Sequence, residues 1–235
     1  MAKELDSDLF VWGRPVSLGN FNLLSIGILF TTFFITIFLK VTLCSDVQCS
    51  PVPWYYPWIL AVPQLLLLGL VLSFSGLGYK GMKSFFTMPN NQRWVSASLL
   101  TVVLSVGAIF IYSLVAYKMD VTYLMPPQIT KGILGEGSFV IVNLFAIAIW
   151  VPLMEELFFR GLLLSVWVTY YGEIKSILLA SLIFMLVHSH PGLYVPVFIS
   201  SVLISALFIK TGTIWAPFLS HSAQNLLVAV VAASA

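Results

Sequence analysis

Seven long apolar runs, separated by short polar connections, constrain this 235-residue chain more than any other feature. An apolar run of roughly 18 residues or more with few charges is long enough to cross a bilayer as a helix. The runs are 21–39, 57–77, 94–116, 138–170, 176–188, 193–209 and 213–232. The sequence therefore predicts an all-α fold, a polytopic membrane helix bundle of about seven transmembrane segments.

The composition supports the same conclusion. Charged residues make up only 9% of the chain and hydrophobic residues 60%, with a formal net charge of +2. A soluble domain carries about 25% charged residues, and a disordered chain is polar and highly charged. We therefore expect one integral membrane domain over 1–235, with lipid as its main solvent and no nucleic acid partner.

Positive charge between the second and third runs predicts the orientation. Lys80, Lys83 and Arg93 lie there without an acidic residue, which is typical of a cytoplasmic loop. The N-terminus is then cytoplasmic and the first connection is external. This connection contains Cys44 and Cys49, and the sequence leaves open whether they form a disulfide or remain two separate thiols.

Ionisable residues are distributed unevenly along the runs. The first three runs have none in their interiors, whereas a Glu-Glu pair, an arginine and all three histidines lie in or at the ends of later runs. An ionisable side chain at membrane depth costs between about 2.5 and more than 10 kcal/mol, so it is kept only when paired, hydrated or required. We expect residues 1–137 to be mainly scaffold and 138–235 to carry the site.

The first polar group follows Pro152, where we expect a kink or a break, and the helix can restart after this proline. Glu155 and Glu156 would then lie in its first turn, where the helix dipole favours negative charge. Glu156 and Arg160 are four residues apart and can pair on one face. Glu155 points about 100° away and would lack that partner, as expected of a general base. The alternative is a solvated acidic pair at an interfacial helix start.

The second group places Phe184 and His188 on one helical face, just before Pro191-Gly192 ends the helix. We expect His188 to be hydrogen-bonded at the helix end. The alternative for a single histidine here is an interfacial residue with satisfied hydrogen bonds. His190 lies off this face, and we interpret it as structural or as a loop contact.

The third group is His221 and Asn225, which project from one stripe of the last run into the bundle. An asparagine beside a histidine can orient the ring or donate to an oxyanion. The alternative is hydrogen bonding between helices, worth about 1 kcal/mol per contact.

Together these groups form a set that could activate water and stabilise a tetrahedral oxyanion. Glu155, His188 and His221 would be the ligands if a metal is bound, because carboxylates and imidazoles are normal zinc ligands with water completing the shell. The sequence lacks the HExxH helix of common zinc proteases. Zinc and a glutamate-only mechanism both stay open.

These motifs resemble the CPBP intramembrane proteases, also called the Abi or CaaX-protease-and-bacteriocin-processing group, which includes the type II CaaX prenyl endopeptidases. The matching residues, in family order, are Glu155-Glu156…Arg160, Phe184…His188 and His221…Asn225. The resemblance covers about the last hundred residues. It implies an endopeptidase with a conical active-site cavity inside the bundle.

The resemblance also implies a role for each residue. Glu155 would activate water with help from His188, and His221 and Asn225 would stabilise the oxyanion. Glu156, Arg160 and Phe184 would support the geometry.

The predicted function is hydrolysis of a peptide bond in a membrane-associated or lipid-modified protein or peptide. The substrate stays open between a prenylated CaaX protein, a bacteriocin leader, a pheromone precursor and another membrane peptide. The alternative from a different class is a non-catalytic scaffold or a bacteriocin-immunity-type protein, whose polar residues serve only as internal hydrogen bonds. A small transporter is less favoured, because transporter sites usually draw on both halves of a repeat.

Overall fold

The computed structural model describes residues 9–11, 14–44, 53–74, 86–89, 92–127 and 133–234. The helices are α1 (Leu18–Leu43), α2 (Tyr56–Ala61), α3 (Leu65–Ser73), α5 (Arg93–Lys118), η2 (Thr122–Leu124), α6 (Phe139–Phe145), η3 (Ala146–Trp150), α7 (Val151–Glu156), η4 (Leu157–Leu164), α8 (Ser165–Tyr171), α9 (Glu173–Leu186), α10 (Pro191–Thr211) and α11 (Trp215–Ser234). Before α1, the strands β1 (Leu9–Val11) and β2 (Arg14–Val16) form an antiparallel hairpin.

The predicted helix bundle is confirmed. The described part of the chain has seven helical segments, because α2–α3 and α6–α8 are each one helix with local irregularities. Five are long and apolar enough to span a membrane: Leu18–Leu43, Tyr56–Ser73, Arg93–Lys118, Phe139–Tyr171 and Pro191–Thr211. The helix α9 has only 14 residues, and α11 carries the polar residues of the third motif. The five apolar spans support an integral membrane protein, in which the second motif lies on a shorter helix and the third on a helix with polar residues.

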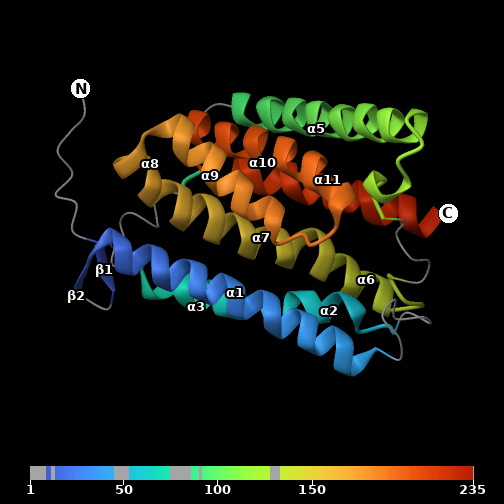
Figure 1. Ribbon diagram of the computed structural model, residues 1–235, viewed down its shortest axis with the longest axis horizontal. Coiled ribbons are helices and arrows are strands. Elements are labelled where there is room, and N and C mark those ends of the chain that lie inside the picture. Colours follow the sequence, from blue (N-terminus) through green and yellow to red (C-terminus); the bar gives the residue numbers. More distant parts are fainter. Residues whose placement is uncertain are drawn as a thin grey trace.

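The long helix α6–α8 forms the centre of the bundle. It runs diagonally between α1, α2 and α3 on one side and α5, α10 and α11 on the other (Figure 1). Contacts of η4 with α3, of α7 with α11 and of η3 with α11 connect the two sides through this helix. Residues from both halves of the chain therefore meet along it.

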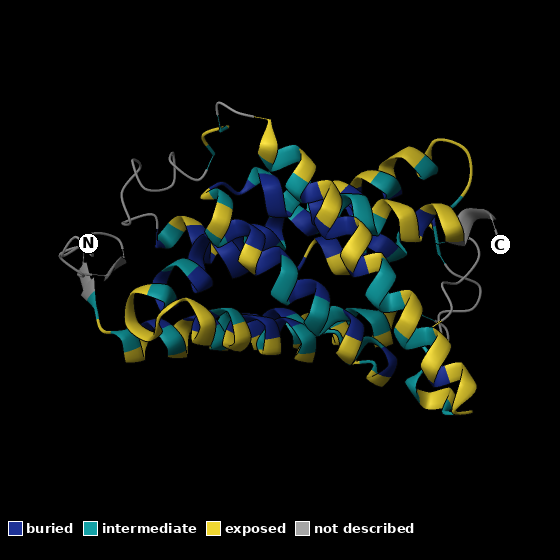
Figure 2. Cartoon of the chain, turned by 90° about the horizontal axis from the view of Figure 1, so that it is seen from above, coloured by how far each residue is buried: buried dark blue, intermediate teal, exposed yellow. Residues whose placement is uncertain are grey.

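Burial follows the same plan. Buried residues gather at the middle of the bundle, and exposed ones cover the outward faces of the helices (Figure 2). Residues 157–164 are all buried, whereas large apolar side chains such as Leu23, Phe110 and Ile141 are exposed. Exposed apolar side chains are favourable when the surrounding solvent is hydrocarbon, so this pattern fits a bundle embedded in lipid.

Of the kink and the break expected at Pro152, the break with a restart of the helix does not occur. The helix continues through this proline, and residues 146–150 widen into a π-helical turn in which the N–H of Val151 bonds to the carbonyl of Ala146. A proline has no N–H to give, and a π-turn is a common way to absorb such an interruption. Glu155 and Glu156 therefore lie in mid-helix, and the dipole of a helix start does not act on them.

Several sequence predictions concern residues outside the described part of the chain. Lys80, Lys83 and Cys49 lie outside it. Arg93 is the first residue of α5, and Cys44 is disulfide-bonded. The predicted cytoplasmic N-terminus stays a prediction.

The turn between α9 and α10 fixes the end of the helix that carries His188. His190 is the N-cap of α10, and its side chain accepts a hydrogen bond from the N–H of Gly192, which confirms its structural interpretation. A Cβ at residue 192 would overlap the backbone of Met125 and Pro126. Only glycine allows this close approach.

We therefore expect Gly192→Ala to destabilise the protein by about 1–3 kcal/mol, the usual cost of overpacking. The measurement is thermal unfolding in detergent. Gly107→Ala is the matched control, because a Cβ at residue 107 meets nothing within 4 Å. Equal unfolding midpoints for the two variants would contradict the prediction.

Candidate active site

The candidate site is built around a buried ion pair. The Nη1 of Arg160 donates to Oε1 of Glu156 at 2.8 Å, and both side chains are almost completely buried. The spacing of four residues predicted this contact. Burial without a partner would be very unfavourable for either charge, so the two ions require each other.

The remaining donors of Arg160 are satisfied by α10. Its Nη2 donates to the hydroxyl of Ser201 at 2.9 Å, and its Nε donates to the hydroxyl of Ser205 at 3.3 Å. The guanidinium also lies over the ring of Phe184, 4.9 Å from the ring centroid. The arginine therefore ties the central helix to α9 and α10 at the level of the two glutamates.

His221 lies between the two carboxylates. Its Nδ1 is 2.8 Å from Oε1 of Glu156, and its Nε2 is 3.7 Å from Oε2 of Glu155. Because an ionised carboxylate can only accept, Nδ1 carries a hydrogen and donates it to Glu156. The ion pair therefore orients the ring, and Nε2 is directed toward Glu155.

Glu155 has a different environment from Glu156. Its side chain is 16% exposed, whereas that of Glu156 is 0% exposed. As expected, Arg160 pairs with Glu156, and the hydrogen-bond partner of Glu155 is the neutral side chain of Gln64, which donates to its Oε1 at 2.9 Å. Glu155 is thus the accessible carboxylate of the pair, and it is held by the N-terminal half of the chain.

A pocket of about 100 Å³ reaches Glu155. Side chains of α1, α2 and α3 line it together with Gln64, Glu155, Phe159 and Val187. This pocket lies inside the bundle, where the resemblance implied a cavity. It is the route by which small groups can contact the Glu155 carboxylate.

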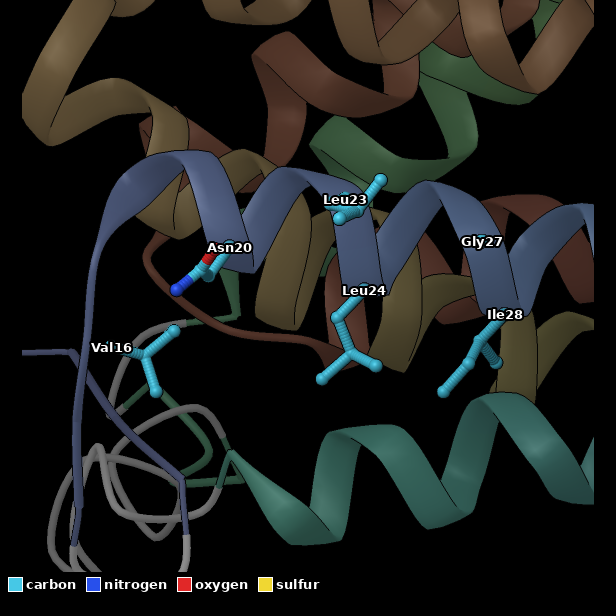
Figure 3. Close-up of a pocket in the computed structure, with 6 residues that line it drawn as sticks. All are labelled: Val16, Asn20, Leu23, Leu24, Gly27 and Ile28. Carbon is cyan, nitrogen blue, oxygen red and sulfur yellow. The ribbon is translucent and has the colours of Figure 1, made fainter.

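A larger pocket of about 560 Å³ lies along α1 and is lined by Val16, Asn20, Leu23, Leu24, Gly27 and Ile28 (Figure 3). None of these residues is ionisable. This groove is therefore separate in chemistry from the pocket at Glu155.

His188 is hydrogen-bonded at the end of α9, as expected. Its Nδ1 lies 2.8 Å from the carbonyl oxygen of Phe184. The ring of Phe184 packs against both imidazoles, with centroid distances of 4.9 Å to His188 and 5.8 Å to His221. A carbonyl accepts only, so Nδ1 is the protonated nitrogen and Nε2 of His188 is left for other partners.

Asn225 contacts the central helix at its irregular turn. Its Nδ2 donates to the carbonyl oxygen of Ile147 at 3.0 Å. In the π-turn this carbonyl would accept from residue 152, but Pro152 has no N–H. The asparagine therefore supplies the hydrogen bond that the proline removes, and one hydrogen of its amide stays available for another acceptor.

The described residues contain no group of three or more His, Cys, Asp or Glu side chains placed to hold a metal ion. Nδ1 of His221 is committed to Glu156, and Nδ1 of His188 to the backbone. These bonds leave Nε2 of each ring as the nitrogen that could bind a metal ion.

Sequence reasoning missed three residues of the site. Gln64, Ser201 and Ser205 are not ionisable, and the search for charges in apolar runs passed over them. The available signals were a single amide inside the second run and two serines four residues apart in the sixth. Polar side chains at such positions often form contacts between helices.

The buried ion pair generates the first prediction for this site. We expect Arg160→Met to destabilise the protein by about 3–5 kcal/mol, because Glu156 would remain buried without its cation. The double variant Glu156→Gln with Arg160→Met leaves no unpaired charge, so it should be more stable than Arg160→Met alone. Thermal unfolding of the wild type, Arg160→Met and the double variant checks this, and an equally unstable double variant would contradict it.

The contact at Ile147 generates a second prediction. Asn225→Ala should cost about 1 kcal/mol, because a partly buried carbonyl loses its donor. In a Pro152→Ala background, the N–H of residue 152 can serve this carbonyl, and the cost should shrink. A double-mutant cycle of unfolding midpoints measures the coupling, and strictly additive effects would show that the two positions do not share the carbonyl.

Comparison with known proteins places these contacts in a family. No protein of curated function and no solved structure matches the chain. A family model described as type II CAAX prenyl endopeptidase Rce1-like matches residues 137–227. This range contains all seven residues of the three motifs and the two serines, whereas Gln64 lies outside it. Residues 137–227 are therefore similar to the type II CAAX prenyl endopeptidases of this model, which supports the resemblance to the CPBP or CaaX protease-like family.

Proposed function

We propose that this protein is an intramembrane endopeptidase in which Glu155 activates the attacking water. One observation carries the proposal: His221 bridges two adjacent glutamates of different character. Glu156 is sealed in an ion pair, whereas Glu155 lines a pocket. A carboxylate that is accessible inside an otherwise apolar bundle is suited to general base catalysis.

The proposed reaction adds water across a peptide bond. Glu155 accepts a proton from water while the water oxygen attacks the carbonyl carbon, and a tetrahedral oxyanion forms. The C–N bond then breaks, and Glu155 returns the proton to the leaving nitrogen. His188, whose Nδ1 is fixed by the carbonyl of Phe184, would help to orient the water through Nε2.

The oxyanion needs donors that are in place before the reaction. His221 is oriented by Glu156, so a hydrogen on its Nε2 would have a fixed direction. Asn225 retains one amide hydrogen after its bond to Ile147. These two donors lie four residues apart on α11 and would stabilise the developing negative charge.

The proposed substrate is a membrane-associated protein or peptide. The family model is described as a prenyl endopeptidase of the CAAX type, which supports a prenylated C-terminal segment as the first substrate to examine. The cytoplasmic N-terminus inferred from the sequence is part of the same proposal.

The test is Glu155→Gln in proteoliposomes. The substrates are a quenched fluorogenic peptide ending in a farnesylated cysteine and three further residues, its unprenylated twin, and a panel of hydrophobic membrane peptides. We expect the variant to lose about 10²–10⁴-fold in turnover, the usual contribution of a general base. Glu173→Gln is the matched control, because Glu173 is exposed at the start of α9.

The outcomes are distinct. Turnover by Glu173→Gln and by the wild type, but not by folded Glu155→Gln, supports the proposal. Undiminished cleavage by Glu155→Gln, or no cleavage of any peptide by the wild type, argues for the non-catalytic class instead.

A further inference from the structure

Gln64 brings the N-terminal half of the chain into the site. It follows Pro63 at the irregular turn between α2 and α3, where it is the N-cap of α3. Its side chain is 8% exposed, and its Nε2 donates to Oε1 of Glu155 at 2.9 Å. It lines the same pocket as Glu155.

The amide of Gln64 is only half satisfied. Its Oε1 is buried and has no hydrogen-bond partner among the described residues. A buried acceptor without a partner is unfavourable, and an apolar side chain of the same volume would avoid this cost. The contribution of Gln64 to folding therefore does not explain its presence, whereas its contact with Glu155 does.

The two oxygens of Glu155 face different partners. Gln64 holds Oε1, and Oε2 lies 3.7 Å from Nε2 of His221. This separation is too long for a direct hydrogen bond. A carboxylate released from Gln64 could rotate and move closer to His221, where a direct ion pair would occupy both the base and the oxyanion donor.

We propose that Gln64 is a positioning residue that holds Glu155 in its productive orientation and keeps it apart from His221. This inference rests on the proposed function of Glu155. Gln64 acts through Glu155 and does not itself take part in the transfer of protons.

The test substitutes Gln64→Met, which conserves the volume and removes both polar atoms. We expect kcat to fall about 10–100-fold, because misplacement of a reacting group by about 1 Å has an effect of this size. KM should change by less than about 3-fold, since the contact orients the base and does not bind the substrate. The midpoint of thermal unfolding should be unchanged or higher.

Gln224→Met is the matched control. Gln224 is a partly buried amide whose Nε2 also lacks a partner among the described residues, but its Oε1 accepts from Ser200 and no carboxylate is involved. The same substitution there should leave kcat within about 2-fold of the wild type, as for a change outside the catalytic groups.

A second readout does not depend on cleavage. Infrared spectra of the wild type and Gln64→Met should differ in the carboxylate stretching band, because that carboxylate loses a donor. The difference should vanish when both proteins also carry Glu155→Gln. Identical spectra would overturn the inference by showing that the contact is absent.

The kinetic outcomes separate the two proposals. If Glu155→Gln is inactive and Gln64→Met turns over at the wild-type rate, the role of Gln64 is wrong and the proposed function stands. If Gln64→Met lowers kcat and the unfolding midpoint together, Gln64 is structural and the inference also fails. If Glu155→Gln is fully active, the proposed function fails, and the role of Gln64 falls with it.

Discussion

The Glu156–Arg160 ion pair is the interaction on which the rest of the site depends. Two charges inside an apolar bundle are stable only when they are paired with each other and supported by further hydrogen bonds. Arg160 donates hydrogen bonds to Ser201 and Ser205 of α10 and lies over the ring of Phe184 on α9. Glu156 recruits His221 from α11. The partners of this one buried pair therefore come from four helices, which are the central helix, α9, α10 and α11.

The pair also separates the roles of two chemically identical neighbours. Successive residues of a helix point about 100° apart, so Glu156 faces Arg160 while Glu155 faces the pocket and Gln64. The carboxylate of Glu156 is buried and has a structural role, whereas the carboxylate of Glu155 stays accessible. His221 contacts both carboxylates and thereby connects the buried ion pair to Glu155, the group proposed to react.

Two of the backbone irregularities beside the site are each associated with a proline. Pro152 widens the central helix into a π-turn, and Asn225 compensates the carbonyl that is left without a donor. Pro63 precedes the irregular turn that presents Gln64. Irregular backbone inside a membrane is tolerated where other groups restore the lost hydrogen bonds. The turn after Pro63 places Gln64 in contact with Glu155, and the π-turn places the carbonyl of Ile147 in contact with Asn225.

The sequence by itself determined the helical membrane fold, the Glu156–Arg160 pair and the concentration of ionisable groups in residues 138–235. These features follow from apolar run length and from a spacing of four residues, which are local properties. Only the tertiary structure decided that the helix continues through Pro152, that Glu155 has a partner and that Gln64, Ser201 and Ser205 belong to the site. These contacts join residues that are 41 or more positions apart. Helical periodicity carries no information about which distant helix packs against a given face.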